Sequence, residues 1–125
     1  MDKLIIEQGV KTPRIEFDPS GFMKITGRSV PENAIEFYNP IHEWINKLSV
    51  YPEAGFKLIV QLEYFNTSSS KCLLDLFRRL ESIHLQGTCS VSISWLYDEG
   101  DEDMLESGED YQQIVKIPFT FGKAD

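Results

Sequence analysis

The amino-acid sequence predicts an α/β domain built on a mixed β-sheet, with helices mainly on one face. Segments with the two-residue periodicity of strands alternate with segments of helical periodicity along most of the chain. Strands separated by helices of this length imply parallel crossovers, whereas Pro19-Ser20-Gly21 joins two short β-rich runs into a hairpin. In residues 90–97 one side is apolar and the other is mostly serine, which indicates that helices cover a single face of the sheet.

The residue pattern in the first half of the chain predicts this hairpin and one helical region. Residues 14–18 and 22–27 are its two strands, because both runs are rich in β-branched and aromatic side chains. The segment Ser29-Val30-Pro31-Glu32-Asn33 resembles a helix start, with its first two residues as cap candidates and a proline near the first helical position. Apolar residues then recur at helical spacing over 35–48 and are interrupted by Pro40, so we expect one kinked helix or a short helix followed by a longer one.

The second half predicts two strands separated by a long helix. Residues 56–65 are the clearest strand, and their alternation places Tyr64 on the apolar face. An amphipathic helix follows the polar turn 66–69 and ends at Gly87, since glycine readily adopts the left-handed conformation that stops a helix. Residues 90–97 form the next strand. The aromatic residues that follow the predicted buried faces are assigned to the core: Trp44, Tyr64, Phe77 and Trp95.

An acidic segment and a last strand complete the chain. Eight carboxylates and no Lys or Arg lie between Asp98 and Asp110, which leaves 12 of the 20 acidic residues to balance 12 basic ones elsewhere. We expect a loop with a short helix around residues 104–111, followed by a strand over 114–121. Calcium-loop spacing fails, because the third position counted from Asp98 is Gly100. A solvated acidic loop is the simplest interpretation, and a docking surface for a basic partner or a metal site are the alternatives.

Composition restricts the class of protein. A chain of 125 residues with 42% hydrophobic residues can bury one core, so we expect a single domain over residues 1–125. A net charge of −8 argues against binding to nucleic acid. Because no apolar run has the length of a membrane helix, we expect no membrane association and a soluble, cytoplasmic protein. Cys72 and Cys89 lack the spacing of a metal or redox site and are expected to be buried free thiols.

Four consecutive hydroxyl residues in Asn66-Thr67-Ser68-Ser69-Ser70 stand between a predicted strand and a predicted helix. Helix capping explains one or two of them, because these side chains accept hydrogen bonds from the free N–H groups of a first turn. A phosphorylation switch is the second interpretation. A phosphate with a charge of about −1.5 to −2 is accommodated beside the positive end of a helix, and it would repel a partner that packs closely on the turn. Both interpretations are open at this point.

A small enzyme is a third interpretation of the same turn. Ser68 at a strand-to-helix turn is a candidate hydrolase nucleophile, but its flanking residues Asn66 and Ser70 are not the small residues that a nucleophile elbow requires. His42 and His84 lie in separate predicted helices, and their spacing suggests no common site. His84 lies on an apolar stripe and is better explained as a packing residue. The glycine-rich phosphate-binding motifs do not occur in the sequence.

Several short motifs occur in a characteristic order between about residues 12 and 121. They are Gly27-Arg28-Ser29, Pro31-Glu32-Asn33, Trp44, Tyr64-Phe65-Asn66-Thr67-Ser68-Ser69, Asp75, Phe77, Leu80, Glu81, His84, Gly87, Trp95-Leu96-Tyr97-Asp98 and Pro118-Phe119. In these motifs the chain resembles the SiaC family of bacterial regulatory phosphoproteins, which are similar in layout to STAS anti-anti-sigma domains. The resemblance implies a STAS-like sandwich of sheet and helices.

The resemblance also implies a signalling protein rather than an enzyme, and we expect no cofactor and no bound metal. Thr67 is the implied phosphoacceptor, and Ser68 is the second choice because the hydroxyl run extends to Ser70. The implied partners are a dedicated serine/threonine kinase, a metal-dependent serine/threonine phosphatase and an effector bound by the unmodified form. In the best-known systems this effector is a diguanylate cyclase, which links the switch to cyclic di-GMP and biofilm formation. The expected partner-binding residues are Asn66, Thr67, Ser68, Ser69 and Lys71.

Two other functions are kept as alternatives to the cyclase regulator. One is an anti-sigma factor antagonist that acts on transcription, because the implied layout is shared with such domains. The other is a small hydrolase that uses Ser68.

Overall fold

A six-stranded mixed sheet carries three helices in the computed structural model, which describes residues 1–87 and 89–124. The α/β class predicted from the sequence is therefore confirmed. In chain order the elements are β1 (Leu4–Ile6), β2 (Arg14–Phe17), β3 (Phe22–Ser29), α1 (Ala34–Asn46), β4 (Phe56–Phe65), α2 (Thr67–Leu85), β5 (Val91–Tyr97), α3 (Glu102–Ile114) and β6 (Phe119–Lys123).

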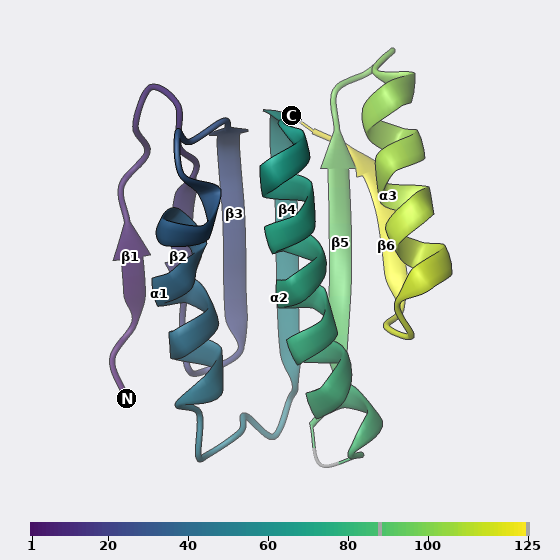
Figure 1. Cartoon of the computed structure of the whole chain (residues 1–125). Helices are drawn as coiled ribbons and strands as arrows, with labels where there is room; N and C mark the ends of the chain where they lie inside the picture. Colours follow the sequence, from purple (N-terminus) through teal and green to yellow (C-terminus); the bar gives the residue numbers. More distant parts are fainter. Residues whose placement is uncertain (88, 125) are drawn as a thin grey trace.

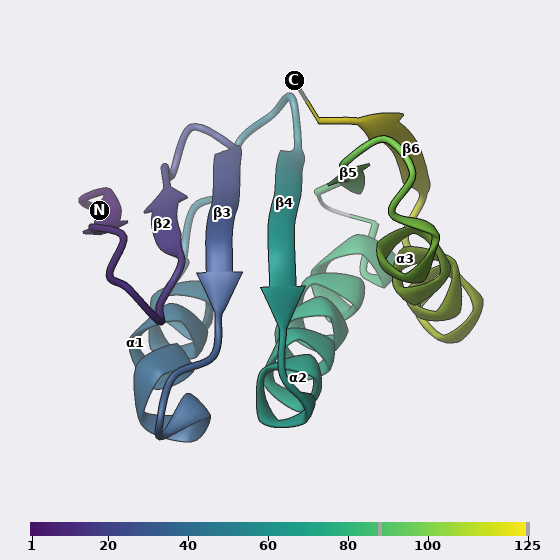
Figure 2. The ribbon, with the colours of Figure 1, turned by 90° about the horizontal axis from the view of Figure 1, so that it is seen from above.

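The strands lie in the sheet in the same order as in the sequence. The β1–β2 and β2–β3 pairs are antiparallel, and β3 to β6 pair in parallel through one helix at each crossover. Crossovers of one hand that all advance in the same direction place their helices on the same face of a sheet. Figures 1 and 2 show α1, α2 and α3 together on one face, as the serine-rich side of β5 predicts.

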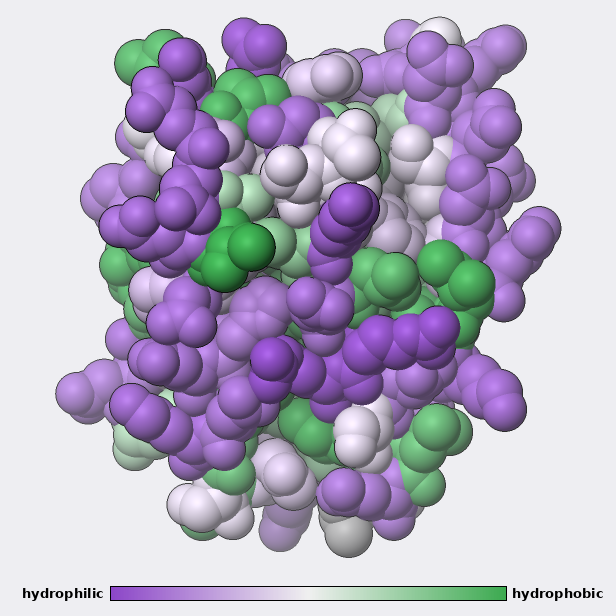
Figure 3. Space-filling model, viewed as in Figure 1, coloured by the Kyte–Doolittle hydropathy of each residue, from purple (hydrophilic) through white to green (hydrophobic). Residues whose placement is uncertain are grey.

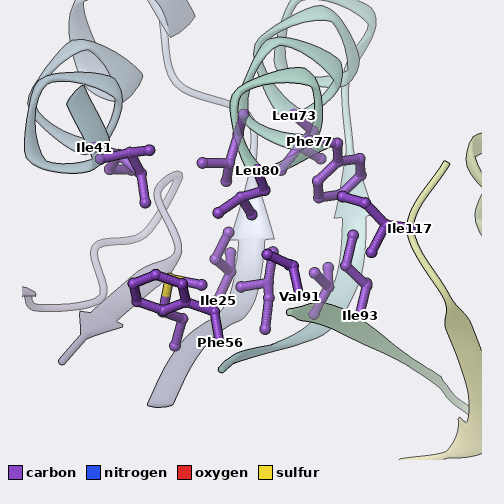
Figure 4. Packing of buried hydrophobic residues seen from close by; sticks show 14 of the residues in the cluster. Ile25, Ile41, Phe56, Leu73, Phe77, Leu80, Val91, Ile93 and Ile117 are labelled. Atoms are coloured by element: carbon purple, nitrogen blue, oxygen red, sulfur yellow. The ribbon is translucent and has the colours of Figure 1, made fainter. Parts of the chain in front are cut away.

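The core lies between this face of the sheet and the helices. Figure 4 shows strand residues meeting residues of α1 and α2, and burying each such side chain stabilises the fold by about 1.5–3 kcal/mol. Among them, Ile25 and Ile93 of the sheet and Ile41, Leu73, Phe77 and Leu80 of the helices are completely buried. No helix in the described part of the chain is long and apolar enough to cross a membrane.

Helix α1 begins later than the sequence pattern predicts. Asn33 is the N-cap, and its side chain accepts a hydrogen bond of 3.1 Å from the Glu36 N–H. Ser29, a predicted cap candidate, instead ends β3. Pro40 lies inside one continuous helix. Pro40 and Glu36 are both exposed, so water can satisfy the Glu36 carbonyl, which Pro40 has no N–H to bond.

Two further boundaries differ from the prediction. The short strand β1 was not predicted, and it is held in part by Trp44, whose Nε1 donates to the Asp2 carbonyl at 2.9 Å. The predicted strand over 114–121 is wrong at its start, because α3 continues to Ile114 and β6 begins at Phe119. The physical reason is a helical repeat of inward-facing residues that extends through the segment: Met104, Gly108, Tyr111 and Val115.

A β-bulge occurs near the end of β4. Gly27 pairs with Leu62, but Arg28 pairs with Tyr64, so Glu63 is an extra residue in β4. An extra residue shifts the alternation of side chains by one position. After the bulge, the positions that the alternation within β4 assigns to the buried face therefore lie on the exposed face.

The bulge decides the environment of two aromatic residues. Phe65 faces the core, with its ring 6.1 Å from that of Trp95, whereas Tyr64 is 53% exposed. The assignment of Tyr64 to the core is therefore wrong. Trp44, Phe77 and Trp95 are buried as predicted.

Gly108 allows α3 to approach the sheet closely. A Cβ atom at this position would lie 2.6 Å from Cδ1 of Trp95, which is completely buried. The Trp95 Nε1 also donates to the Met104 carbonyl in α3 at 2.9 Å. The indole is thus fixed from two sides and cannot move away from an added methyl group.

We predict that Gly108→Ala destabilises the protein, although alanine is the better helix former. Overpacking costs about 1–3 kcal/mol, which exceeds the gain of about 1 kcal/mol in helix propensity. Urea unfolding measures the difference, with Glu106→Ala on the exposed side of α3 as the control. A Gly108→Ala variant that is more stable than wild type would contradict the tight contact with Trp95.

Candidate functional site

The carboxyl ends of β3, β4 and β5 meet at one edge of the sheet, at the top of Figure 1. The helices α1, α2 and α3 begin at the same edge, because each follows one of these strands. Residues after the carboxyl ends of parallel strands commonly form binding sites in α/β proteins. The Asn66–Ser70 turn, singled out from the sequence, lies at this edge between β4 and α2.

Asn66 caps α2, as the capping interpretation predicts. Its side-chain oxygen accepts from the Ser69 N–H at 2.9 Å, and its carbonyl accepts from the Ser70 N–H at 2.9 Å. The Ser70 hydroxyl donates to the Thr67 carbonyl at 2.7 Å. Capping therefore involves Asn66 and leaves the hydroxyl groups of Thr67 and Ser68 for other roles.

The predicted partner-binding residues divide between surface and interior. Consecutive helical residues are about 100° apart around the axis, so residues two positions apart point in nearly opposite directions. Thr67, Ser68 and Lys71 are exposed, and Asn66 is half-buried, whereas Ser69 is completely buried. The Ser69 side chain contacts other parts of the protein and is not accessible to a partner.

A chain of buried hydroxyl groups fixes Ser69. Its Oγ donates to the Ser29 carbonyl at 3.0 Å and accepts from the Ser29 hydroxyl at 2.8 Å. The Ser29 Oγ is also 2.7 Å from the Tyr38 hydroxyl. Because Ser29 gives its one proton to Ser69, Tyr38 must be the donor in this last bond. The chain joins β3, α1 and α2, and all three residues are completely buried.

Two tyrosines anchor the turn from neighbouring helices. Tyr38 of α1 reaches it through Ser29, and the Tyr111 hydroxyl of α3 donates to the Ser70 carbonyl at 2.9 Å. Burial raises the pKa of Tyr38 to about 12 and also raises the pKa of Tyr111. Both hydroxyls therefore stay protonated at neutral pH and act as fixed donors. The sequence pattern gave no indication of these two roles.

We predict that Tyr38→Phe destabilises the protein by about 1–3 kcal/mol, because the Ser29 hydroxyl loses its buried donor. Thermal or urea unfolding measures the effect. Tyr64→Phe is the matched control, since the Tyr64 side chain is exposed and the change should stay within about 0.5 kcal/mol. Equal stability of the two variants would show that the buried hydroxyl chain contributes nothing.

The two histidines are engaged far from Ser68. His42 is buried, and its Nδ1 accepts from Nε of Arg79 at 3.1 Å. Arg79 lies eleven residues beyond Ser68 on α2, a rise of about 16 Å. His84 accepts from the Val91 N–H at 3.0 Å near the other end of α2, which fits its predicted packing role. Neither imidazole is placed to activate Ser68.

Both cysteines are buried free thiols, as the sequence predicts. Burial raises the pKa of Cys72 and of Cys89, which lowers the reactivity of both thiols at neutral pH.

Part of the acidic segment serves to start α3. Asp101 is the N-cap, and its Oδ1 accepts from the Met104 N–H at 3.0 Å. Glu102 and Asp103 occupy the first turn, where negative charge is favourable next to the helix N-terminus. No group of three or more His, Cys, Asp or Glu residues suited to a metal ion occurs among residues 1–87 and 89–124.

We predict that protonation of His42 destabilises the fold. Burial and the positive charge of Arg79 lower the pKa of His42 below its ordinary value of 6.5, and these outweigh the opposite effect of Asp75. Well above pH 6.5 the His42 imidazole is neutral in both the folded and the unfolded chain, so its contribution to stability is fully present. As the pH falls through this value, the unfolded chain takes up a proton more readily than the folded one, so the stability decreases.

Melting temperatures between about pH 7.5 and 5.5 test this pH dependence against His42→Gln, which does not titrate. Wild type should lose more stability than the variant over this range, and the carboxylates common to both cancel in the difference. Parallel curves would contradict the prediction.

The structure thus defines an α/β domain that presents a hydroxyl turn, fixed from behind, at the carboxyl edge of its sheet. Comparison with known proteins assigns this domain to a family. A model described as SiaC family regulatory phosphoprotein matches residues 6–124. The chain belongs to the SiaC family of regulatory phosphoproteins, which confirms the resemblance seen in its motifs.

The similar proteins agree with this assignment. An uncharacterized protein of Pseudomonas aeruginosa (strain UCBPP-PA14) is 32% identical, over 100% of this chain and 99% of its own length. Apo-SiaC from Pseudomonas aeruginosa is 30% identical and superimposes with a TM-score of 0.87, over 98% of this chain and 99% of its own.

Another structure shows SiaC together with a partner. It is the crystal structure of the diguanylate cyclase SiaD in complex with its activator SiaC, also from Pseudomonas aeruginosa. The TM-score is again 0.87, with 30% identity over 97% of this chain and 99% of that one.

Proposed function

We propose that this chain is a phosphorylation-switched binding protein. Its unmodified form binds and regulates a diguanylate cyclase, and a phosphate on Thr67 abolishes the complex. The observation that supports the proposal most directly is the exposed position of Thr67 as the first residue of α2, on a turn fixed from behind by Ser29. A kinase can reach this hydroxyl, and the fold does not depend on leaving it unmodified.

The helix start suits a phosphate group. The first N–H groups of a helix have no partner in a preceding turn, and their positive end attracts an anion. The Asn66 side chain accepts from the Ser69 N–H. It does not use the backbone N–H groups of Thr67 and Ser68, which lie on the exposed side and are available to a phosphate. Ser69 is buried and is not accessible to a kinase, whereas Ser68 is exposed and remains the second choice.

The complex of SiaD with its activator SiaC supports the choice of partner, because that SiaC is similar to this chain over nearly the whole length of both. A reversible switch further requires a serine/threonine kinase and, for removal of the phosphate, a phosphatase, which we propose is metal-dependent. We assign the regulatory role to one domain over residues 1–125, acting in the cytoplasm and without an enzymatic activity of its own.

We predict that incubation with ATP and the cognate kinase adds one phosphate to wild type and none to Thr67→Ala, as measured by intact-mass spectrometry. Ser68→Ala is the control and should be phosphorylated like wild type. Full phosphorylation of Thr67→Ala would show that the acceptor has been assigned wrongly, and loss of the phosphate in Ser68→Ala would move it to Ser68.

For binding, we predict that Thr67→Glu and phosphothreonine at position 67 weaken the complex with the cognate cyclase at least about tenfold, or ~1.4 kcal/mol. The melting temperature should stay close to that of wild type, because negative charge is favourable at a helix N-terminus. Pull-down and calorimetry compare these forms with Thr67→Ala, which should still bind. Unfolding of the Glu variant would show that Thr67 matters mainly to the fold and would contradict the switch. Capture of an anti-sigma factor instead of a cyclase would favour the transcriptional alternative.

A further inference from the structure

A groove of about 440 Å³ lies beside the Thr67 turn, between the starts of α1 and α2. Figure 1 shows these two helices side by side, with their first turns at the same edge of the sheet. Glu32, Asn33, Ala34 and Ile35 line one wall, and Ser68, Lys71, Cys72 and Asp75 line the other. The groove therefore joins two residues of the predicted binding surface, Ser68 and Lys71, to residues at and just before the start of α1.

The α1 wall carries an exposed apolar side chain. Ile35 is 79% exposed, whereas Ala34 and Cys72 in the same groove are buried. Hydrophilic residues make up most of this face of the molecule, with hydrophobic residues in separate areas among them (Figure 3). A single exposed isoleucine is ordinary on a protein surface, but here it stands next to a concave site with an apolar floor. This arrangement suits an apolar side chain of a partner.

The α2 wall carries a cation one turn after the candidate phosphoacceptor. Thr67, Lys71 and Asp75 are spaced by four residues, so they lie on the same side of the helix. Lys71 is exposed and takes part in none of the ion pairs among the described residues. Glu32, across the groove, pairs instead with Lys11, whose Nζ lies 4.0 Å from the Glu32 Oε1. Lys71 is therefore available to a partner carboxylate.

The two walls are held in a fixed relation. The Tyr38 hydroxyl on α1 bonds Ser29, and Ser29 bonds Ser69 on α2, all within the protein interior. Because folding has already ordered the backbone of both walls, a partner would bind without the entropic cost of arranging the two helix starts.

We propose that this groove is the docking surface, and that it takes a protein segment presenting an apolar side chain next to a carboxylate. The apolar side chain contacts Ile35, and the carboxylate pairs with Lys71. A cation of the same segment faces Asp75 and Glu32. The inference rests on the proposed function, since it names the partner surface that the Thr67 switch controls.

The spacing of Thr67 and Lys71 explains how the switch would act. An acid four residues before a lysine on a helix is the favourable orientation for an ion pair. A phosphate on Thr67 would take Lys71 as its partner, so the docking carboxylate would lose its cation and meet a charge of about −1.5 to −2 instead. Release then results from competition for Lys71, and the fold does not have to change.

Matched substitutions test the groove, with the immobilised cognate diguanylate cyclase as the probe. Ile35→Ser should weaken binding at least about tenfold, whereas Val50→Ser should leave it within about twofold. Val50 is a suitable control because it is also 79% exposed and lies outside this groove. Lys71→Ala is compared in the same way with Lys57→Ala, another exposed lysine outside the groove. Equal affinity of the members of each pair would overturn the groove as the docking surface.

The competition is tested with phosphothreonine at position 67, introduced into wild type and into Lys71→Ala. The phosphate should weaken binding of the cyclase to wild type by a larger factor than binding to the variant, because the variant has no Lys71 ammonium group for the phosphate to take. Equal factors would overturn the competition for Lys71. If the phosphate leaves wild-type binding unchanged, the proposed function itself fails; if wild type is switched but Ile35→Ser binds like Val50→Ser, that function stands and the groove does not.

Discussion

The carbonyl and hydroxyl groups of Ser29 hold together the part of the structure on which function depends. The carbonyl accepts from the Asn66 N–H at 3.1 Å and from the Ser69 hydroxyl, and the hydroxyl links Ser69 to Tyr38. Burying three hydroxyl groups is unfavourable unless each is hydrogen-bonded, and here each one is. Each of these bonds requires its partner at a defined position, so the polar chain fixes one arrangement of β3, α1 and the start of α2.

The order of the strands explains why that arrangement produces a surface. Because sheet order follows sequence order, α1 and α2 come from successive crossovers and lie side by side, with their first turns at one edge. Asn33 and Asn66 cap these two helices in the same way, each accepting from the N–H three residues later. A groove between two capped helix starts is thus a consequence of the topology. Its chemistry is set by the few side chains that point into it.

Local pattern in the sequence was sufficient for the α/β class, the parallel crossovers, the open face of the sheet and the capped turn at Asn66, since each depends on periodicity or on residue type at one place. The bulge at Glu63 depends on how β4 pairs with β3, and periodicity within one strand cannot show it. The hydrogen bonds of Tyr38 and Tyr111 join segments that are distant in the sequence, so local pattern does not indicate them either. Ser69 is different, because the buried residues Leu73 and Leu76 lie four and seven positions later, so the helical stripe itself indicates that Ser69 faces inward.

Each residue of the polar turn 66–70 has its own role. Asn66 caps the helix, Ser69 joins the interior, and Ser70 bonds the Thr67 carbonyl, which leaves Thr67 and Ser68 at the surface. A modification at an inward-facing position would disrupt the bonds to Ser29, and its effect would include a loss of stability. At Thr67 the same charge meets a helix end that favours it. Under the proposed switch, the free-energy difference between the two forms is then expressed in partner binding, because the fold is common to both.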